Sequence, residues 1–449
     1  MYFCIKLTRL YRFLYTKVMK IEQLYELFKQ HPYITTDSRD CPEGSIFFAL
    51  KGCSFNGNQF AKSALDKGCS LAVIDEPEYA VDERCIVVDN CLRTLQLLAR
   101  HHRRQFDIPV IGITGTNGKT TTKELVSAVL GERYQVLYTQ GNFNNDIGVP
   151  KTLLRLNGHH EIAVIEMGAS HPGDIKTLVE LVEPDYGIIT NVGRAHLQGF
   201  GSFEGVVKTK GELYDFLRTR PNSKVFIHLD NPHLTGMAQD LQQIGYGTDA
   251  KLHPVIEGHI DSCAPCLSFS YREPAGEWHH IDSHLIGSYN IYNMLAAACI
   301  GHHFGVTPEQ IDHALAGYIP SNNRSQLELT GRNRLIVDAY NANPTSMAAA
   351  LENFRMMQVD NKLAILGDMR ELGEVSAEEH QKTVDYLQES PFCDVWLVGE
   401  EFGKTHCPFR KFRNVEEVED ELSRHCPENH CILIKGSNGI HLAQLKDKL

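Results

Sequence analysis

The residues of this chain with the clearest potential for chemistry lie between Thr114 and Thr121, in the sequence TGTNGKTT. Gly115 and Gly118 allow the backbone to curl so that successive N–H groups point toward phosphate oxygens, and Lys119 adds a positive charge. A threonine directly after such a lysine can bind Mg²⁺ through its hydroxyl, which makes Thr120 the natural first metal ligand. We therefore expect a nucleoside triphosphate here, held by Gly115, Thr116, Asn117, Gly118, Lys119, Thr120 and Thr121.

The loop departs from the standard phosphate-binding pattern at one position. Counting back from Lys119 places Ile113 where the first glycine belongs, and Gly112 stands one place earlier. A glycine turn that only packs a helix against a sheet is the alternative interpretation. The run Gly118-Lys119-Thr120 at a strand-to-helix junction favours phosphate binding.

The flanking segments predict the elements that position this loop. The β-branched run 110–113 predicts a strand, and Leu125, Val126 and Val129 recur behind the loop at helical spacing. Two more apolar strands are expected, one ending at Glu166 and one followed by a loop with His196. Ligands gather beyond the carboxyl ends of strands in open α/β sheets, so we expect Glu166 to hold Mg²⁺ and His196 to contact metal or phosphate.

The helix expected at 203–217 carries two lysines, Lys208 and Lys210. Either of them could be only a solvated charge. A lysine can also bind the transferring phosphoryl group, or become an anionic metal ligand when it is modified to a carbamate. The sequence leaves these options open.

Polar loops mark further candidate binding segments. Asn142, Asn144 and Asn145 follow the strand expected at 134–139, and such asparagine-rich sequence predicts a loop at a strand end, where ligands gather. Asn290 and Asn293 share one face of a small-residue helix expected from Gly287. Their amides could pair with an adenine edge, or act only as caps and packing residues.

Near the N-terminus, Asp37, Ser38 and Arg39 precede a small α/β unit. Such a trio can simply brace a turn. It also suits a diphosphate, because arginine supplies a charged fork and serine a hydroxyl donor.

The alternation of strands and helices predicts the α/β class with parallel sheets. We expect an N-terminal domain at 1–107, a central domain at 108–318 that includes antiparallel strands between 252 and 286, and a C-terminal domain at 319–449. The strands expected in the last domain are 334–337, 363–366, 395–398 and 431–434. The loops after its strands carry Asp338, Tyr340, Asn341 and Asn343.

Composition limits the classes of function. The 449 residues include 44 basic and 56 acidic side chains, and the net charge of −12 argues against nucleic acid as the main partner. The 13 scattered cysteines predict reduced thiols in a cytoplasmic protein, and the pair Cys263 and Cys266 has no zinc-binding partners. No transmembrane segment is expected.

The first eighteen residues carry four basic side chains and no acidic one. Charges interrupt their apolar run and no small-residue cleavage site follows, so a signal peptide is not expected. Met19 looks like a better start, and we expect residues 1–18 to be an over-extended start.

The assembled motifs resemble those of the Mur ligase family, the ATP-dependent amide-bond-forming enzymes of bacterial cell-wall synthesis. TGTNGKTT is similar to that family's own phosphate loop, which accounts for the misplaced glycine. The likeness runs from Asp37 to Ser437. Its other motifs are GNFNNDIGVPKTLL from Gly141, EMGASHPGDI from Glu166, NVGRAHLQGFGS from Asn191, YNANPTSM from Tyr340 and GDMRELGE from Gly367.

The resemblance implies three domains: one for a UDP-sugar, a central ATPase, and a Rossmann-like C-terminal domain that closes over ATP and receives the amine. It further implies a monomeric, cytoplasmic enzyme that joins D-alanyl-D-alanine to UDP-N-acetylmuramoyl-tripeptide through an acyl phosphate. The products would be ADP, phosphate and the pentapeptide precursor of peptidoglycan, which links the enzyme to cell shape and division.

The resemblance also implies roles for single residues. Thr120 and Glu166 would hold one Mg²⁺, and His196 with Lys210 a second, with Lys210 at the position of a lysine that is carbamylated in relatives. The remaining positions fall into three groups. Adenine, ribose and phosphates would be contacted by Asn290, Asn293, Arg324 and Asp338. The UDP-sugar peptide would be contacted by Asp37, Ser38, Arg39, Asn142, Asn144 and Asn145. The dipeptide would be oriented by Tyr340, Asn341 and Asn343.

Two departures and three rivals accompany this interpretation. Val337 stands where many relatives have a second aspartate, and Asn56 replaces a usual aspartate. The rivals are the ligase that adds the third amino acid, a folylpolyglutamate synthase, and a regulatory protein that lost the chemistry. The loop from Tyr340 argues against the first rival, and the Asp-Ser-Arg trio argues against the second. The retained Lys119, Glu166 and His196 argue against the third.

Overall fold

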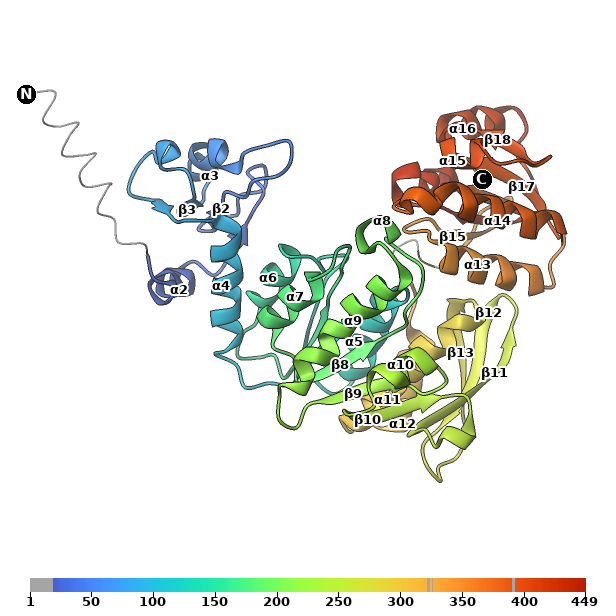
Figure 1. The fold of residues 1–449 in the computed structure, drawn as a ribbon, viewed down its shortest axis with the longest axis horizontal. Helices are drawn as coiled ribbons and strands as arrows, with labels where there is room; N and C mark the ends of the chain where they lie inside the picture. The colour runs from blue at the N-terminus through green and yellow to red at the C-terminus, as the bar shows by residue number, and fades with distance from the viewer. Residues whose placement is uncertain (1–18, 321–323, 325, 390–391) are drawn as a thin grey trace, which may run out of the picture. The chain divides into compact units, whose positions relative to one another are not determined.

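The computed structural model describes residues 19–320, 324, 326–389 and 392–449 (Figure 1). The over-extended start expected at 1–18 lies outside the described residues, as do 321–323 of the expected C-terminal domain. The chain forms two compact units. The first contains the described part of Met1–Ile108 with Asn142–His160 and Glu180–Glu183, and the second contains Pro109–Gly141, Glu161–Val179 and the described part of Pro184–Leu449.

The first unit is built on a parallel sheet with the order β1-β2-β3-β4. Its strands are β1 Ile34–Thr35, β2 Ile46–Phe48, β3 Leu71–Ile74 and β4 Cys85–Val87. Its helices are α2 Ile21–Gln30, η1 Gly57–Phe60, α3 Ala61–Asp66, η2 Pro77–Tyr79, α4 Cys91–Arg103 and α6 Gly148–Leu153. This confirms the small α/β unit expected from the sequence.

Helix α6 joins this unit from far along the chain. Residues 142–160 fall within the central domain expected from the sequence, but they pack against α4 in the first unit. Gln96 donates a hydrogen bond to the carbonyl of Asp146 at 3.2 Å, and the His102 ring lies 2.9 Å from the carbonyl of Leu156. Contacts between residues so far apart in sequence leave no local signature.

The second unit contains a nine-stranded sheet with the order β13-β12-β11-β10-β9-β8-β5-β7-β6 (Figure 1). All neighbours from β6 to β11 are parallel, whereas β11, β12 and β13 are antiparallel, as expected for 252–286. The strands are β5 Val110–Thr114, β6 Val136–Tyr138, β7 Ile162–Glu166, β8 Tyr186–Ile189, β9 Lys224–His228, β10 Gln242–Gly247, β11 Ile256–Cys263, β12 Cys266–Arg272 and β13 His279–Ile286.

Helices α5 and α11 pack on each other beside this sheet. A side chain on Gly301 would meet Val129 at 2.4 Å, so the close approach requires glycine there. The expected helix from Gly287 begins only at Ile291, after a 3₁₀ turn. The helices of this region are α5 Lys119–Gly131, α7 Asp174–Val182, α8 Leu197–Phe200, α9 Phe203–Arg218, α10 Pro232–Met237, η3 Ala250–Leu252, η4 Ser288–Asn290, α11 Ile291–His303 and α12 Pro308–Gly317.

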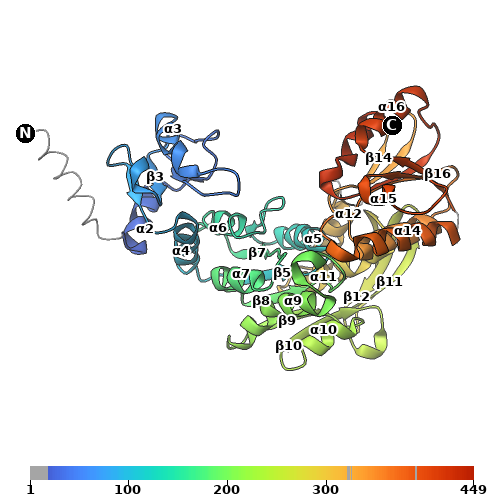
Figure 2. The same ribbon diagram turned by 45° about the horizontal axis from the view of Figure 1, so that its top comes forward.

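The end of the chain forms a six-stranded sheet with the order β14-β15-β19-β16-β17-β18 (Figure 2). Its strands are β14 Gln326–Leu329, β15 Arg334–Asp338, β16 Lys362–Gly367, β17 Asp394–Val398, β18 Arg410–Phe412 and β19 Cys431–Lys435. Its helices are α13 Pro344–Met356, η5 Gly373–Val375, α14 Ser376–Glu389, α15 Glu400–Gly403, α16 Val415–Arg424, η6 Asn438–Ile440 and η7 Leu442–Asp447. The four expected strands are confirmed, and the short edge strands β14 and β18 were missed.

Among the described residues, no helix combines the length and the apolar character needed to cross a membrane.

Candidate active site

The loop between β5 and α5 has the geometry of a phosphate cradle. Gly115 and Gly118 have φ values of 142° and 77°, which side chains other than glycine rarely adopt. The loop is also fixed to the segment that follows β8. Thr190 Oγ1 donates to the carbonyl of Asn117 at 2.6 Å, and the N–H of Asn117 donates to Asn191 Oδ1 at 2.9 Å. These roles of Thr190 and Asn191 were not predicted from the sequence.

Gly118→Ala is expected to weaken ADP binding about tenfold. Alanine at this left-handed position costs about 1–2 kcal/mol, and its Cβ would lie 2.7 Å from Asn293 Oδ1. Titration calorimetry with ADP measures the effect. The matched control is Gly131→Ala at the far end of the same helix, where a Cβ would meet nothing within 4 Å. Equal ADP affinity of the two variants would contradict the expectation.

Lys119 begins helix α5 and folds back over the loop. Its Nζ donates to the carbonyls of Gly115 at 2.9 Å and Thr116 at 3.0 Å. Loss of solvent lowers the pKa of Lys119 to about 8, against the opposing attraction of Glu166. The ammonium is therefore held against the backbone of the loop, and the Lys119 side chain is half-buried.

Thr120 and Glu166 meet where the phosphate loop lies beside the end of β7. Thr120 Oγ1 donates to Glu166 Oε1 at 3.1 Å, and both side chains are buried. The N–H of Glu166 donates to Thr139 Oγ1 at 3.0 Å, which fixes the strand end. A hydroxyl and a carboxylate are hard oxygen donors, so this pair fits Mg²⁺. Within the described chain, no three His, Cys, Asp or Glu side chains form a group that could hold a metal.

The remaining loop threonines differ in their surroundings. Thr116 is buried, and its Oγ1 accepts a hydrogen bond from the N–H of Gly193 at 3.0 Å. Thr121 lies half-buried in the first turn of α5.

Lys210 is the buried lysine of α9, whereas Lys208 is exposed. The Lys210 Nζ reaches the carbonyl of Ala169 at 3.4 Å and lies 5.3 Å from the centre of the Phe200 ring. Burial, followed by repulsion from Lys119, holds the pKa of Lys210 well below its ordinary value. The structure thus distinguishes the two lysines, which the sequence did not.

His196 also contacts the Phe200 ring, edge to face at 6.2 Å between centroids. It precedes α8 in the left-handed conformation, with φ of 50°. Its Nδ1 pairs with Glu371, a residue whose own φ is 64°. Phe200 is therefore a shared neighbour of His196 and Lys210. The contact with Glu371 was not predicted from the sequence.

Asn293 and Asn290 form a chain of amide hydrogen bonds above the loop. Thr122 Oγ1 donates to Asn293 Oδ1 at 3.0 Å, and Asn293 Nδ2 donates to Asn290 Oδ1 at 2.8 Å. Asn290 Nδ2 then donates to the carbonyl of Ile286 at 2.8 Å. Asn290 is only 2% exposed, and these hydrogen bonds within the protein use much of the bonding capacity of its amide. The adenine contact expected for Asn290 stays a prediction.

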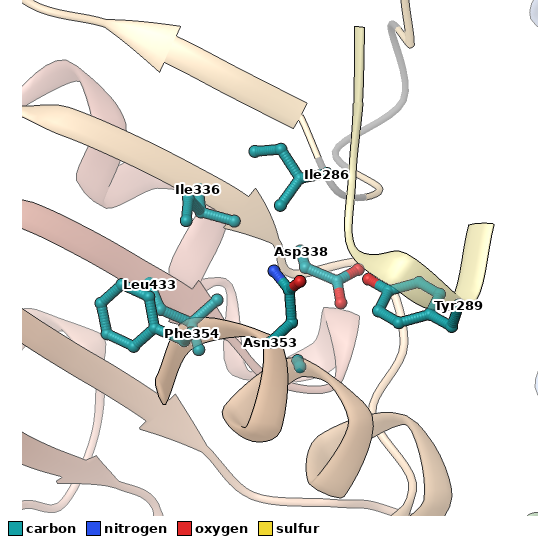
Figure 3. Close-up of a pocket in the computed structure, with 8 residues that line it drawn as sticks. Ile286, Tyr289, Ile336, Asp338, Asn353, Phe354 and Leu433 are labelled. Atoms are coloured by element: carbon teal, nitrogen blue, oxygen red, sulfur yellow. The ribbon is translucent and has the colours of Figure 1, made fainter. Parts of the chain in front are cut away.

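Arg324 and Asp338, which were predicted to contact the nucleotide, each have a partner within the protein. The Arg324 guanidinium stacks 4.1 Å above the centre of the Tyr340 ring. Lys435 Nζ donates to Asp338 Oδ2 at 2.6 Å, since the two residues are register partners on β19 and β15. In Figure 3 the Asp338 carboxylate and the Tyr289 hydroxyl point toward each other. The pocket there is lined by Ile286, Tyr289, Ile336, Asp338, Ala350, Asn353, Phe354 and Leu433.

The residues of the loop at 340–343 differ in exposure, and one of them contacts the phosphate loop. Asn341 is exposed, whereas Asn343 is buried and its Nδ2 donates to Asn117 Oδ1 at 2.8 Å. The structure thus brings a predicted dipeptide-binding residue to the predicted ATP-binding loop.

The expected UDP-sugar residues lie in the first unit. Arg39 Nη2 pairs with Asp37 Oδ2 at 2.8 Å, and this pairing lowers the pKa of Asp37. Arg39 is exposed, whereas Asp37 and Ser38 are half-buried. Asn145 Oδ1 accepts the N–H of Gly148 at 2.8 Å and so orders the start of α6. The two further asparagines of that loop are Asn142 and Asn144.

Three family models match the chain in order. The Mur ligase family catalytic domain matches 32–103, the Mur ligase middle domain matches 113–301, and the Mur ligase glutamate ligase domain matches 323–438. A curated protein of Bacillus subtilis named UDP-N-acetylmuramoyl-tripeptide–D-alanyl-D-alanine ligase is 33% identical over 92% of each chain. The chain belongs to the Mur ligase family.

Other relatives of this Mur ligase extend the comparison. The Escherichia coli protein of the same name is 33% identical over 82% of this chain and 81% of its own. A crystal structure of MurF from Acinetobacter baumannii covers 96% of this Mur ligase and 99% of its own chain, with 28% identity and a TM-score of 0.85. MurF from Thermotoga maritima in complex with ADP covers 96% and 98%, with 25% identity and a TM-score of 0.83. The α/β class and the Mur ligase architecture expected from the sequence are confirmed.

Proposed function

We infer that this Mur ligase joins D-alanyl-D-alanine to UDP-N-acetylmuramoyl-tripeptide at the expense of ATP. The observation that carries the inference is the cradle formed by Lys119, Thr120 and Glu166, in a chain that matches dipeptide ligases over nearly its whole length. The products are ADP, phosphate and UDP-N-acetylmuramoyl-pentapeptide.

The reaction needs an activated carboxylate, because a carboxylate oxygen is a poor leaving group. The terminal carboxylate of the tripeptide attacks the γ-phosphorus of ATP, which forms an acyl phosphate and releases ADP. The free amine of the dipeptide then adds to the acyl carbon, gives up a proton, and expels phosphate from the tetrahedral intermediate. The protein contributes positioning and charge neutralisation to both steps.

The phosphate loop supplies the positioning for ATP. The N–H groups at the N-terminal end of α5 would face the phosphates, whereas the N–H groups of Thr116 and Asn117 already donate to Asn191. Lys119 would add its charge beside them. Mg²⁺, when bound, would neutralise charge between the γ-phosphate and the attacking carboxylate. Thr120 and Glu166 would hold one ion, and His196 with Lys210 a second.

The environment of Lys210 supports its conversion to a carbamate. A neutral amine is the form that attacks carbon dioxide, and burial favours the neutral form of Lys210. The nitrogen forms a bond to the carbon of CO₂ and loses one proton, which leaves a carbamate. The product is an oxygen donor, and therefore a better ligand for Mg²⁺ than an amine.

The other substrates are assigned to the remaining segments. We propose the domains 1–107 for the UDP-sugar, 108–318 for ATP, and 319–449 for closure over ATP and for the dipeptide. The UDP-sugar peptide would contact Asp37, Ser38, Arg39, Asn142, Asn144 and Asn145. Adenine would contact Asn290 and Asn293, and the ribose and phosphates would contact Asp338 and Arg324. Tyr340, Asn341 and Asn343 would orient the dipeptide in a cytoplasmic, monomeric enzyme.

The test is phosphate release from ATP in the presence of UDP-N-acetylmuramoyl-tripeptide and Mg²⁺. Release is expected only when D-alanyl-D-alanine is added, together with a pentapeptide product detected by mass spectrometry. Parallel reactions contain single amino acids, or folate with glutamate. Release that depends on one of those would overturn the dipeptide assignment.

A further inference from the structure

Asn343 is the N-cap of helix α13, and this role fixes the direction of its side-chain amide. Its Oδ1 accepts the N–H of Ser346 at 2.9 Å, and its own N–H donates to Ser346 Oγ at 3.1 Å. The side chain is only 3% exposed. Because the cap needs an oxygen, the NH₂ group of Asn343 must point away from the helix.

That NH₂ group meets the phosphate loop. Asn343 Nδ2 donates to Asn117 Oδ1 at 2.8 Å, whereas the reverse pairing, from Asn117 Nδ2 to Asn343 Oδ1, spans 3.5 Å, the outer limit of a hydrogen bond. The start of α13 is also held in place nearby, since the N–H of Arg194 donates to Thr345 Oγ1 at 3.2 Å. The pair therefore orients the carboxamide of Asn117. Its oxygen accepts from Asn343, one N–H of its NH₂ group lies at the edge of the same pair, and the second N–H is left for another acceptor.

The backbone of Asn117 is fixed independently. Asn191 Oδ1 accepts its N–H, and its carbonyl accepts from Thr190 Oγ1 and Asn191 Nδ2. With the main chain held, rotation of the side chain decides whether a donor or an acceptor faces an anion bound in the loop. A phosphate oxygen accepts hydrogen bonds and repels a carbonyl oxygen.

We propose that Asn343 is a positioning residue that turns the Asn117 amide so that its N–H group, and not its oxygen, faces the nucleotide phosphates. The order of contacts is the helix cap, then Asn343, then Asn117, then the phosphate. The proposal rests on the proposed function, because it requires a nucleotide in this loop. It also gives the C-terminal segment a direct effect on nucleotide affinity.

The decisive variant is Asn343→Asp. Aspartate keeps an oxygen for the N–H of Ser346, so the cap survives, but it offers a second oxygen to Asn117. The Asn117 amide must then turn its NH₂ group toward the carboxylate and present its oxygen to the phosphates. ADP affinity, measured by calorimetry, is expected to fall about thirtyfold. Asn343→Ser also keeps a cap but is too short to reach Asn117, and it is expected to cost about threefold.

A double-mutant cycle separates reorientation from simple charge repulsion. In an Asn117→Ala background, Asn343→Asp is expected to lower ADP affinity by no more than about threefold, since no amide remains to be turned. A loss equal to that in the wild-type background, or no loss in either, would overturn the proposal. Unchanged Tm values show that each variant keeps its fold. A wild-type protein that binds no ADP would overturn the proposed function itself.

Discussion

Lys119→Met is expected to lower kcat/KM for ATP about a thousandfold, which corresponds to about 4 kcal/mol of lost transition-state stabilisation. Methionine keeps much of the volume of the lysine side chain. It removes the ammonium group, which donates hydrogen bonds to the carbonyls of Gly115 and Thr116. The effect is large because the half-buried ammonium lies on the phosphate loop itself, where its charge would act directly on a bound phosphate. The measurement is ATP-dependent phosphate release under steady-state conditions with both peptide substrates.

Lys176→Met, on the exposed side of α7, is the matched control for Lys119→Met and should keep kcat/KM within about twofold. Retained activity of Lys119→Met within threefold of wild type would refute a role of this lysine in phosphate binding. A drop in both variants would instead indicate a general effect of removing positive charge.

The second large effect is expected for Lys210→Ala, with kcat reduced about a thousandfold and ADP affinity nearly unchanged. The side chain is buried beside Phe200 and Ala169, and the proposed carbamate would help to hold the Mg²⁺ that supplies positive charge during phosphoryl transfer. ADP lacks that phosphoryl group, so its binding should depend little on Lys210. Kinetics and calorimetry on the same preparation separate the two quantities.

Lys208→Ala is the matched control for Lys210, since it removes a lysine from the same helix at an exposed position. Its kcat should stay within about twofold of wild type. The carbamate itself is tested by labelling with carbon-13 bicarbonate and NMR, where wild type and Lys208→Ala should show a carbamate signal that Lys210→Ala lacks. A signal lost in Lys208→Ala instead would assign the modification to the other lysine.

The sequence by itself predicted the elements of the phosphate site and their order. A β-branched strand, a glycine loop and a helix are specified by neighbouring residues, so 110–130 folded as expected. Glu166 was identified because an apolar strand ends there, and the register that places it beside Ile113 follows from parallel pairing of β7 with β5. Local propensity and strand ends are properties of short segments, which a single sequence displays.

Only the tertiary structure decided which of several similar residues lies in the site. Lys208 and Lys210 are two positions apart, and their burial differs because a helix turns about 100° per residue and only one faces the packed interior. The pairs His196–Glu371 and Asn117–Asn343 join residues from distant parts of the chain. Helix α6 packs in the first unit, although its position in the sequence predicted the central domain. Such contacts depend on long-range packing and on hydrogen bonds between side chains, and no periodicity or local motif records them.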